Sequence, residues 1–129
     1  MADARLRSPL GRVRGFGSAK EGVNHWWGQR IAGVALVPLV IWFVIALIQH
    51  VGAERAVVVS WLHQPVTAIV MVLTLLVTFY HMALGVQVVV EDYVHTEWTK
   101  MTLLVLNKFF CAILAAAGIF AVLRIAFQG

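Results

Sequence analysis

Three long apolar runs, separated by short polar segments, set the pattern of the chain. Residues 31–48 are apolar without interruption over 18 positions, residues 66–90 contain only a few polar positions, and residues 103–127 form the third run. An α-helix rises about 1.5 Å per residue, so about 20 apolar residues cross the hydrocarbon core of a bilayer. Each run therefore predicts a membrane-spanning helix. Pro38 predicts a bend in the first of them, because proline lacks the backbone amide hydrogen.

The residues ahead of the first run are polar and aromatic. Ser18 and Glu21 have the spacing of a capping box, which predicts that a helix begins there. Trp26 and Trp27, followed by Arg30, are typical of the headgroup level of a membrane. We therefore expect the first span to enter the membrane close to Arg30.

Two polar connections separate the three predicted spans. Residues 49–64 form the first, in which we expect a brief interfacial helix over residues 57–61, and Pro65 suits the first turn of the second span. Residues 91–100 form the second connection. The third span carries small residues suited to close helix contact, namely Ala112, Ala115, Ala116, Ala117 and Gly118.

Composition places the chain among membrane proteins. Of its 129 residues 61% are hydrophobic and only 12% are charged, and its mean hydropathy of +0.87 is far too high for a soluble domain of this size. The expected fold class is therefore all-α, with three transmembrane helices. We expect residues 1–17 to form a basic cytoplasmic tail and residues 18–129 to form the three-helix membrane anchor.

Positive charge is concentrated before the first span. Six of the ten Lys and Arg residues lie in the first thirty positions, and the net charge is +4. Because basic residues are retained on the cytoplasmic side, we expect the amino terminus and residues 91–100 inside and the carboxyl terminus outside. An Arg-rich start also fits a mitochondrial transit peptide, but it leads directly into a span. We therefore favour a retained amino terminus in a bacterial inner membrane.

One histidine, His81, lies well inside a predicted span, about 15 Å from the acidic end of the second run. A polar ring at this depth is costly, so it either binds a ligand, relays protons, or makes an interhelical hydrogen bond. A neutral imidazole can ligate haem iron through one nitrogen while the other donates a hydrogen bond. No second histidine lies at this depth. A haem with two histidine ligands would therefore take its other ligand from a partner chain.

Further polar residues follow His81 on the same predicted helix. Asp92 comes eleven residues later, which on an α-helix is about 20° away in azimuth and about 16 Å along the axis. Gly85 lies between them, where a large flat group would approach the backbone closely. Asp92 and Tyr93 are suited to hydrogen-bonding a quinone carbonyl near the interface. The alternative interpretation is a helix-end acid and an interfacial tyrosine.

The remaining residues indicate no self-contained enzyme. Arg30 either snorkels to lipid phosphates, holds a haem propionate or polarises a quinone, because a guanidinium makes bidentate bonds to carboxylates. Cys111, the single cysteine, is expected to pack inside the third span. The sequence contains no nucleophile-base pair, no glycine-rich phosphate loop and no clustered carboxylates. Any chemistry that the chain serves must therefore be completed by other subunits.

The second span resembles that of the hydrophobic membrane anchor subunit of succinate dehydrogenase, the four-subunit respiratory complex II. In that family a histidine is followed by a glycine four residues on and by an Asp-Tyr pair at plus eleven and plus twelve. These residues are His81, Gly85, Asp92 and Tyr93 here. The segment SAKEGVNHWWGQR also resembles the start of alphaproteobacterial members, and the three-span plan covers the whole chain.

This resemblance implies a function in electron transfer. His81 would be an axial ligand of haem b shared with a second anchor subunit, and Arg30 would lie near the haem propionates. Tyr93 would hydrogen-bond ubiquinone, with Asp92 supporting that site. Electrons would come from succinate through a flavoprotein and an iron-sulfur subunit. Two alternatives stay open: a structural or proton-relay subunit of another membrane complex, and the anchor of a menaquinone-linked fumarate reductase.

Overall fold

The computed structural model describes residues 21–128, and they form helices joined by short connections. The helices are α2 (Glu21–His50), α3 (Arg55–Leu62), α4 (Pro65–Tyr93) and α5 (Glu97–Gln128). The three long ones, α2, α4 and α5, are long and apolar enough to cross a membrane. The described residues contain no strand. The prediction of an all-α membrane protein with three spans is therefore confirmed.

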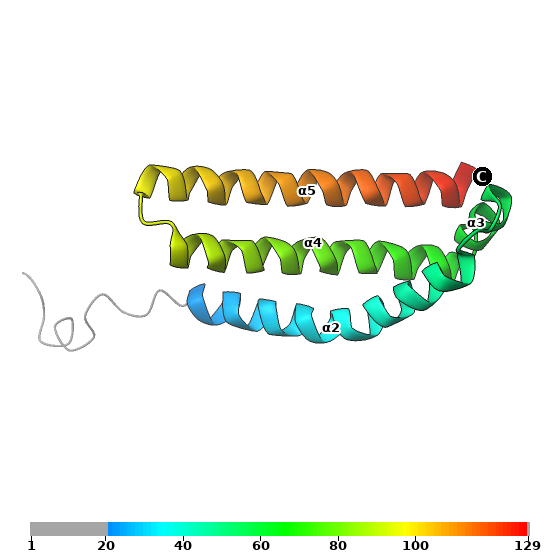
Figure 1. The fold of residues 1–129 in the computed structure, drawn as a ribbon, viewed down its shortest axis with the longest axis horizontal. Coiled ribbons are helices and arrows are strands. Elements are labelled where there is room, and N and C mark those ends of the chain that lie inside the picture. Colours follow the sequence, from blue (N-terminus) through cyan, green and yellow to red (C-terminus); the bar gives the residue numbers. More distant parts are fainter. Residues whose placement is uncertain (1–20, 129) are drawn as a thin grey trace, which may run out of the picture.

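The three long helices lie side by side in a row, with α4 in the middle (Figure 1). Successive long helices run in opposite directions, so the start of α2 and the connection between α4 and α5 lie at the same end. The short helix α3 lies at the other end, where it packs against α4 and α5. Gly52, with a φ of 76°, lies in the turn between α2 and α3, in a backbone conformation that glycine adopts without strain.

The helices are longer than the apolar runs that predicted them. The first span was expected over residues 31–48, but α2 begins at Glu21 and continues to His50. The predicted capping box at Ser18 and the basic tail of residues 1–17 lie outside the described residues. Figure 1 shows that α2 curves in its second half, as expected from Pro38 inside the helix.

The connections are correspondingly shorter. Residues 91–100 were expected to connect the second and third spans, but only residues 94–96 do so, and this prediction was wrong in extent. Gln87 Nε2 donates a hydrogen bond of 2.8 Å to Glu91 Oε1, one turn apart, which supports the last turn of α4. The expected interfacial helix is confirmed as α3, and Pro65 lies in the first turn of α4.

Close packing between α4 and α5 depends on small and polar residues. Asn107 Nδ2 on α5 donates a 2.9 Å hydrogen bond to the carbonyl oxygen of Ala83 on α4. Cys111 is only 4% exposed and its Sγ lies 3.5 Å from Asn107 Oδ1, which agrees with the packing role predicted for it. Gly118 lies against Leu75 of α4. Three of the predicted contact residues are instead exposed on the outer face of α5, namely Ala112, Ala116 and Ala117.

Candidate functional site

His81 lies near the middle of α4 and its ring packs against Gly33 of α2. A Cβ atom added at Gly33 would lie 3.3 Å from His81 Cε1 and 3.8 Å from His81 Nδ1. The histidine is half-buried, so one edge of the ring faces α2 within the chain. The absence of a side chain at Gly33 is what allows the ring to lie against the α2 backbone.

The two ring nitrogens of His81 have different surroundings. Nδ1 is buried and has no hydrogen-bond partner among the described residues. Nε2 does not belong to that set of buried unpaired atoms, and no described residue forms a hydrogen bond with it. We conclude that Nε2 reaches the surface of the chain. The imidazole thus presents one nitrogen to its own chain and the other to whatever lies beside α4.

The sequence suggested that Gly85 is open to a flat ligand, but in the structure the Gln29 side chain lies beside it. A Cβ at Gly85 would lie 3.3 Å from Nε2 of Gln29, because the Gln29 side chain of α2 crosses α4 at this point. The prediction that a large flat group approaches the backbone there was therefore wrong. The glycine instead allows α2 and α4 to come close one turn away from His81.

The half of the molecule where α2 starts contains polar residues on α2 and α4 to which sequence reasoning gave no role. Oε1 of Gln29 and Nε2 of His25 are buried and unpaired within the described part of the chain. The Tyr80 hydroxyl lies against Gly28, where an added Cβ would come within 2.6 Å of it. The spacing offered a signal, because His25, Gln29 and Gly33 recur every four residues and so share one face of a helix.

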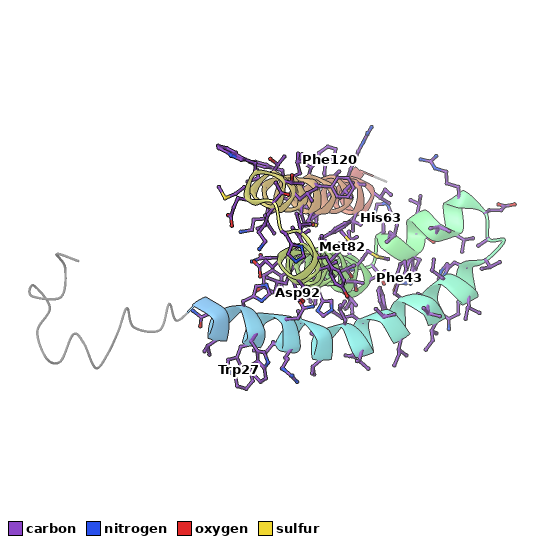
Figure 2. All side chains as sticks on the ribbon, turned by 60° about the vertical axis from the view of Figure 1, so that its left-hand side comes forward. Trp27, Phe43, His63, Met82, Asp92 and Phe120 are labelled. Carbon is purple, nitrogen blue, oxygen red and sulfur yellow. The ribbon has the colours of Figure 1, made fainter. Side chains whose placement is uncertain are left out.

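Arg30 lies on the exposed side of α2 rather than between the helices. Its guanidinium carbon is 4.2 Å from the centroid of the Trp26 ring, which is a cation-π contact. Trp26 in turn meets Trp27 edge to face, with ring centroids 5.0 Å apart. Trp27 points away from the other helices (Figure 2). Arg30 is therefore held by an aromatic ring and free to reach a group outside the chain.

Asp92 and Tyr93 form the last turn of α4. Both side chains are exposed, and Tyr93 is 78% exposed. Asp92 lies on the side of α4 that faces α2 (Figure 2), as expected from its helical spacing to His81 and Gly85. The structure thus brings His81, Gln29 and Gly85 together, whereas Asp92 and Tyr93 lie about three turns further along the helix.

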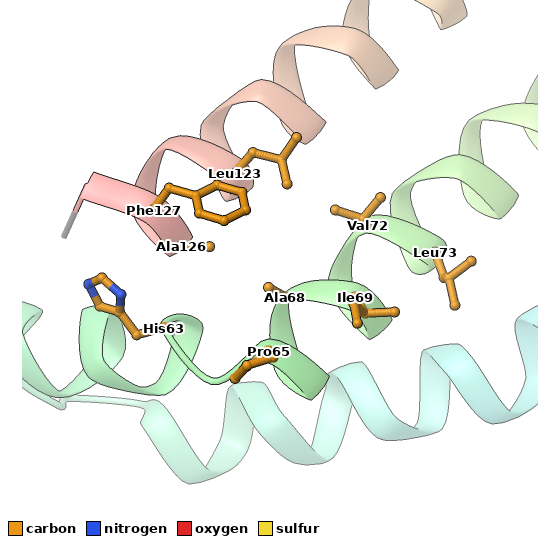
Figure 3. Close-up of a pocket in the computed structure, with 9 residues that line it drawn as sticks. All are labelled: His63, Pro65, Ala68, Ile69, Val72, Leu73, Leu123, Ala126 and Phe127. Atoms are coloured by element: carbon orange, nitrogen blue, oxygen red, sulfur yellow. The ribbon is translucent and has the colours of Figure 1, made fainter.

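An apolar cavity lies away from these residues. It has a volume of about 370 Å³ and opens between α4 and α5 at the end of the molecule where α3 lies (Figure 3). Its lining is apolar apart from one histidine and consists of His63, Pro65, Ala68, Ile69, Val72, Leu73, Leu123, Ala126 and Phe127. None of the predicted site residues lines this cavity.

The residues present fit one axial ligand of a haem rather than a metal site built by this chain. Among residues 21–128, no three His, Cys, Asp or Glu side chains are close enough to hold an ion together. His81 supplies one imidazole at mid-span, with an orphaned Nδ1 on the inner edge. A ligating histidine usually bonds to iron through one nitrogen and donates a hydrogen bond from the other, and the two edges of His81 suit this division.

Comparison with known proteins agrees with the arrangement of the spans. Residues 4–117 match the family described as succinate dehydrogenase/fumarate reductase transmembrane subunit. The chain is 30% identical over 117 residues to the succinate dehydrogenase hydrophobic membrane anchor subunit of Rickettsia bellii, covering 91% of this chain and 94% of the relative. The protein of the same description from Paracoccus denitrificans is 27% identical over 113 residues, covering 88% of each chain.

A third relative, from Rickettsia conorii, carries the same description and is 26% identical over 117 residues, with 90% of this chain and 93% of the relative covered. The comparison with solved structures found no match. The resemblance seen in the sequence is confirmed, and the match extends over most of the three-helix structure. The chain therefore belongs to the family of succinate dehydrogenase/fumarate reductase transmembrane subunits.

Proposed function

We propose that this chain is a membrane anchor of a succinate:ubiquinone oxidoreductase that ligates haem b through His81 and contributes Tyr93 to the site of quinone reduction. The observation that carries the proposal is the two-sided imidazole of His81, whose Nδ1 faces α2 while Nε2 reaches the surface. Two relatives are described as succinate dehydrogenase anchor subunits, and this supports succinate oxidation rather than the reverse reaction as the proposed activity of the complex.

His81 would hold the haem iron through Nε2, with a second anchor subunit supplying the other axial ligand. The haem, when bound, supplies a one-electron carrier within the membrane. Arg30 lies three residues before Gly33 on α2, which is about 4.5 Å nearer to the end where Tyr93 lies. Its exposed guanidinium suits a haem propionate at that edge, because arginine binds carboxylates with two parallel hydrogen bonds.

Tyr93 would donate a hydrogen bond to a quinone carbonyl, with Asp92 beside it as a support for the site. The exposure of both side chains at the end of α4 supports this, since a quinone must enter from the lipid and meet the partner subunits there. Twelve residues separate His81 from Tyr93, or about 18 Å along the helix. Electrons from succinate would arrive through a flavoprotein and an iron-sulfur subunit docked at this end.

The same end would face the bacterial cytoplasm. The start of α2 and residues 94–96 lie at this end (Figure 1), with Trp26, Trp27 and Arg30 within the first three turns of α2 and Lys100 in the first turn of α5. Aromatic residues are typical of both membrane interfaces, and basic residues are enriched on the cytoplasmic side. The carboxyl terminus would then be periplasmic, and the location would be the inner membrane.

The haem assignment is tested by the reduced-minus-oxidised spectrum of the purified complex. His81→Ala is expected to remove the haem b signal, because no other described histidine lies at mid-span. His95→Ala is the matched control, since this exposed histidine lies in the connection after α4, and it should retain the signal. An unchanged haem signal in His81→Ala would refute the assignment.

The quinone assignment is tested by comparing two electron acceptors. Tyr93→Phe removes one hydrogen bond of about 0.5–1.5 kcal/mol, so we expect quinone reduction to fall roughly 2- to 13-fold while succinate oxidation with an artificial dye persists. Tyr80→Phe, the other tyrosine of the chain, is the control and should leave both activities intact. Equal loss of both activities in Tyr93→Phe, or no loss of either, would contradict the proposed site.

A further inference from the structure

Three buried polar atoms on α2 and α4 have no hydrogen-bond partner among the described residues. They are Nε2 of His25, Oε1 of Gln29 and Nδ1 of His81. Leaving such a group unpaired costs about 1–3 kcal/mol, and lipid offers no replacement partner in the interior of a membrane. Because buried polar atoms in proteins are nearly always paired, these atoms indicate polar partners other than the side chains of this chain.

The two α2 residues among them lie on the same face of that helix as Gly33. His25, Gln29 and Gly33 are four residues apart on α2, so they form a single stripe. Gly33 meets the His81 ring, and Gln29 meets Gly85, one turn further along α4. Gln29 thus lies between the levels of His25 and His81, with successive levels about 6 Å apart along the axis.

The chemistry of the three groups suits water. Oε1 of Gln29 accepts hydrogen bonds only, and an imidazole Nδ1 donates when it carries the proton. A buried water makes about three hydrogen bonds, so it can accept from Nδ1 of His81 and donate to Oε1 of Gln29. The His81 ring lies against Gly33 and the Gln29 side chain lies against Gly85, so both polar groups sit where α2 and α4 come close.

We propose that an ordered water joins His81 Nδ1 to Gln29 Oε1, and that Gln29 is thereby a positioning residue for His81. The water holds the histidine proton on Nδ1, so the lone pair of Nε2 is available at the surface of the chain. A second water on the other side of Gln29 pairs Nε2 of His25. The inference rests on the proposed ligation of haem by His81, and it assigns a role to a residue of α2 that never touches the haem.

The hydrogen bond would also tune the haem. A ligating histidine that donates from its second nitrogen is a stronger electron donor to iron, which favours the oxidised state. Removing the acceptor should therefore raise the reduction potential of the haem. A purely structural role for Gln29 would change the stability of the chain and would not change that potential.

The test measures the midpoint potential and the electron paramagnetic resonance spectrum of the haem in the purified complex. Gln29→Met keeps the approximate volume and removes the acceptor, and we expect haem to stay bound with a potential shifted upward. Gln29→Asn keeps an amide that water can reach, and its potential should lie closer to that of the wild type. Gln49→Met is the control, because Gln49 is exposed near the far end of α2, and it should cause no shift.

The outcomes separate this inference from the proposed function. A wild-type complex without haem would overturn both. A wild-type complex with haem, combined with an unshifted Gln29→Met or with equal shifts in Gln29→Met and Gln29→Asn, would overturn the inference alone. If the Gln29→Met complex does not assemble, the wild-type complex still tests the bridging water. Pulsed electron paramagnetic resonance spectra of the wild type in D₂O should show rapid exchange of the His81 Nδ1 proton. A proton that persists in D₂O would overturn the bridging water.

Discussion

Gly33 offers a direct test of how the chain holds His81. An added Cβ would lie 3.3 Å from Cε1 of the ring, whereas carbon atoms in contact are ordinarily about 3.5–4.0 Å apart. Gly33→Ala therefore requires a shift of a few tenths of an ångström. The methyl groups of Gly33→Val reach about 1.5 Å beyond the Cβ, so the ring must move by about 1 Å.

These displacements lead to different expected results. Overpacking of this size costs about 1–3 kcal/mol, while replacing a helical glycine by alanine gains about 0.5–1 kcal/mol. We expect Gly33→Ala to be close to neutral in stability and to keep its haem. Gly33→Val should lose most of the haem, because ligand distances in metal sites vary by only about 0.2 Å. The measurements are haem content per complex and thermal unfolding in detergent.

Two other glycines provide matched controls. A Cβ at Gly118 would lie 3.2 Å from Cδ1 of Leu75, so Gly118→Val overpacks the α4–α5 contact by a similar amount without approaching His81. It should destabilise the chain and keep the haem. A Cβ at Gly22 meets nothing within 4 Å, so Gly22→Val should change neither quantity. Equal haem loss in Gly118→Val and Gly33→Val would refute the argument, because the loss would then follow from general destabilisation.

Two further predictions concern the packing of the spans, and thermal unfolding in detergent measures both. Gly28→Ala places a Cβ 2.6 Å from the Tyr80 hydroxyl and should destabilise the chain by about 1–3 kcal/mol. Tyr80→Phe should restore most of that loss, and an absence of rescue would show that the contact is not the cause. Asn107→Leu removes the 2.9 Å bond to the Ala83 carbonyl and should cost about 0.6–1.7 kcal/mol, so an unchanged unfolding midpoint would contradict its interhelical role.

The number and order of the helices could be predicted from the sequence, as could a helix start near Glu21 and the start of α4 at Pro65, but the helix ends around the second connection could not. The length of an apolar run matches the thickness of the hydrocarbon core, whereas the helix itself can continue beyond that core into the membrane interface. This happens at α2, which starts ten residues before the predicted span. It also happens at α4, where the Gln87–Glu91 hydrogen bond supports polar residues in the last turn, and at α5, where Glu97 favours the first turn of the helix.

The depth of His81 could likewise be predicted, because depth depends only on position along one helix. Its direction could not, since this depends on which residues of α2 face α4. The sequence suggested an open surface at Gly85, but the packing register brings Gln29 there and Gly33 to the histidine ring. Contacts between spans are set by the close approach of small residues on both helices. A single sequence does not show which residues of α2 face which residues of α4.

The arrangement of the helices agrees with the proposal that His81 acts together with a partner chain. The row in Figure 1 is one helix thick, and α4 packs against α2 on one side and α5 on the other. Its remaining faces are open, and many large apolar side chains are exposed along the spans. Lipid can cover those side chains, but it cannot pair with a ring nitrogen at mid-span. Because Nδ1 faces α2, the chain fixes the position and direction of the imidazole, and in the proposed function the group that pairs with Nε2 comes from outside the chain.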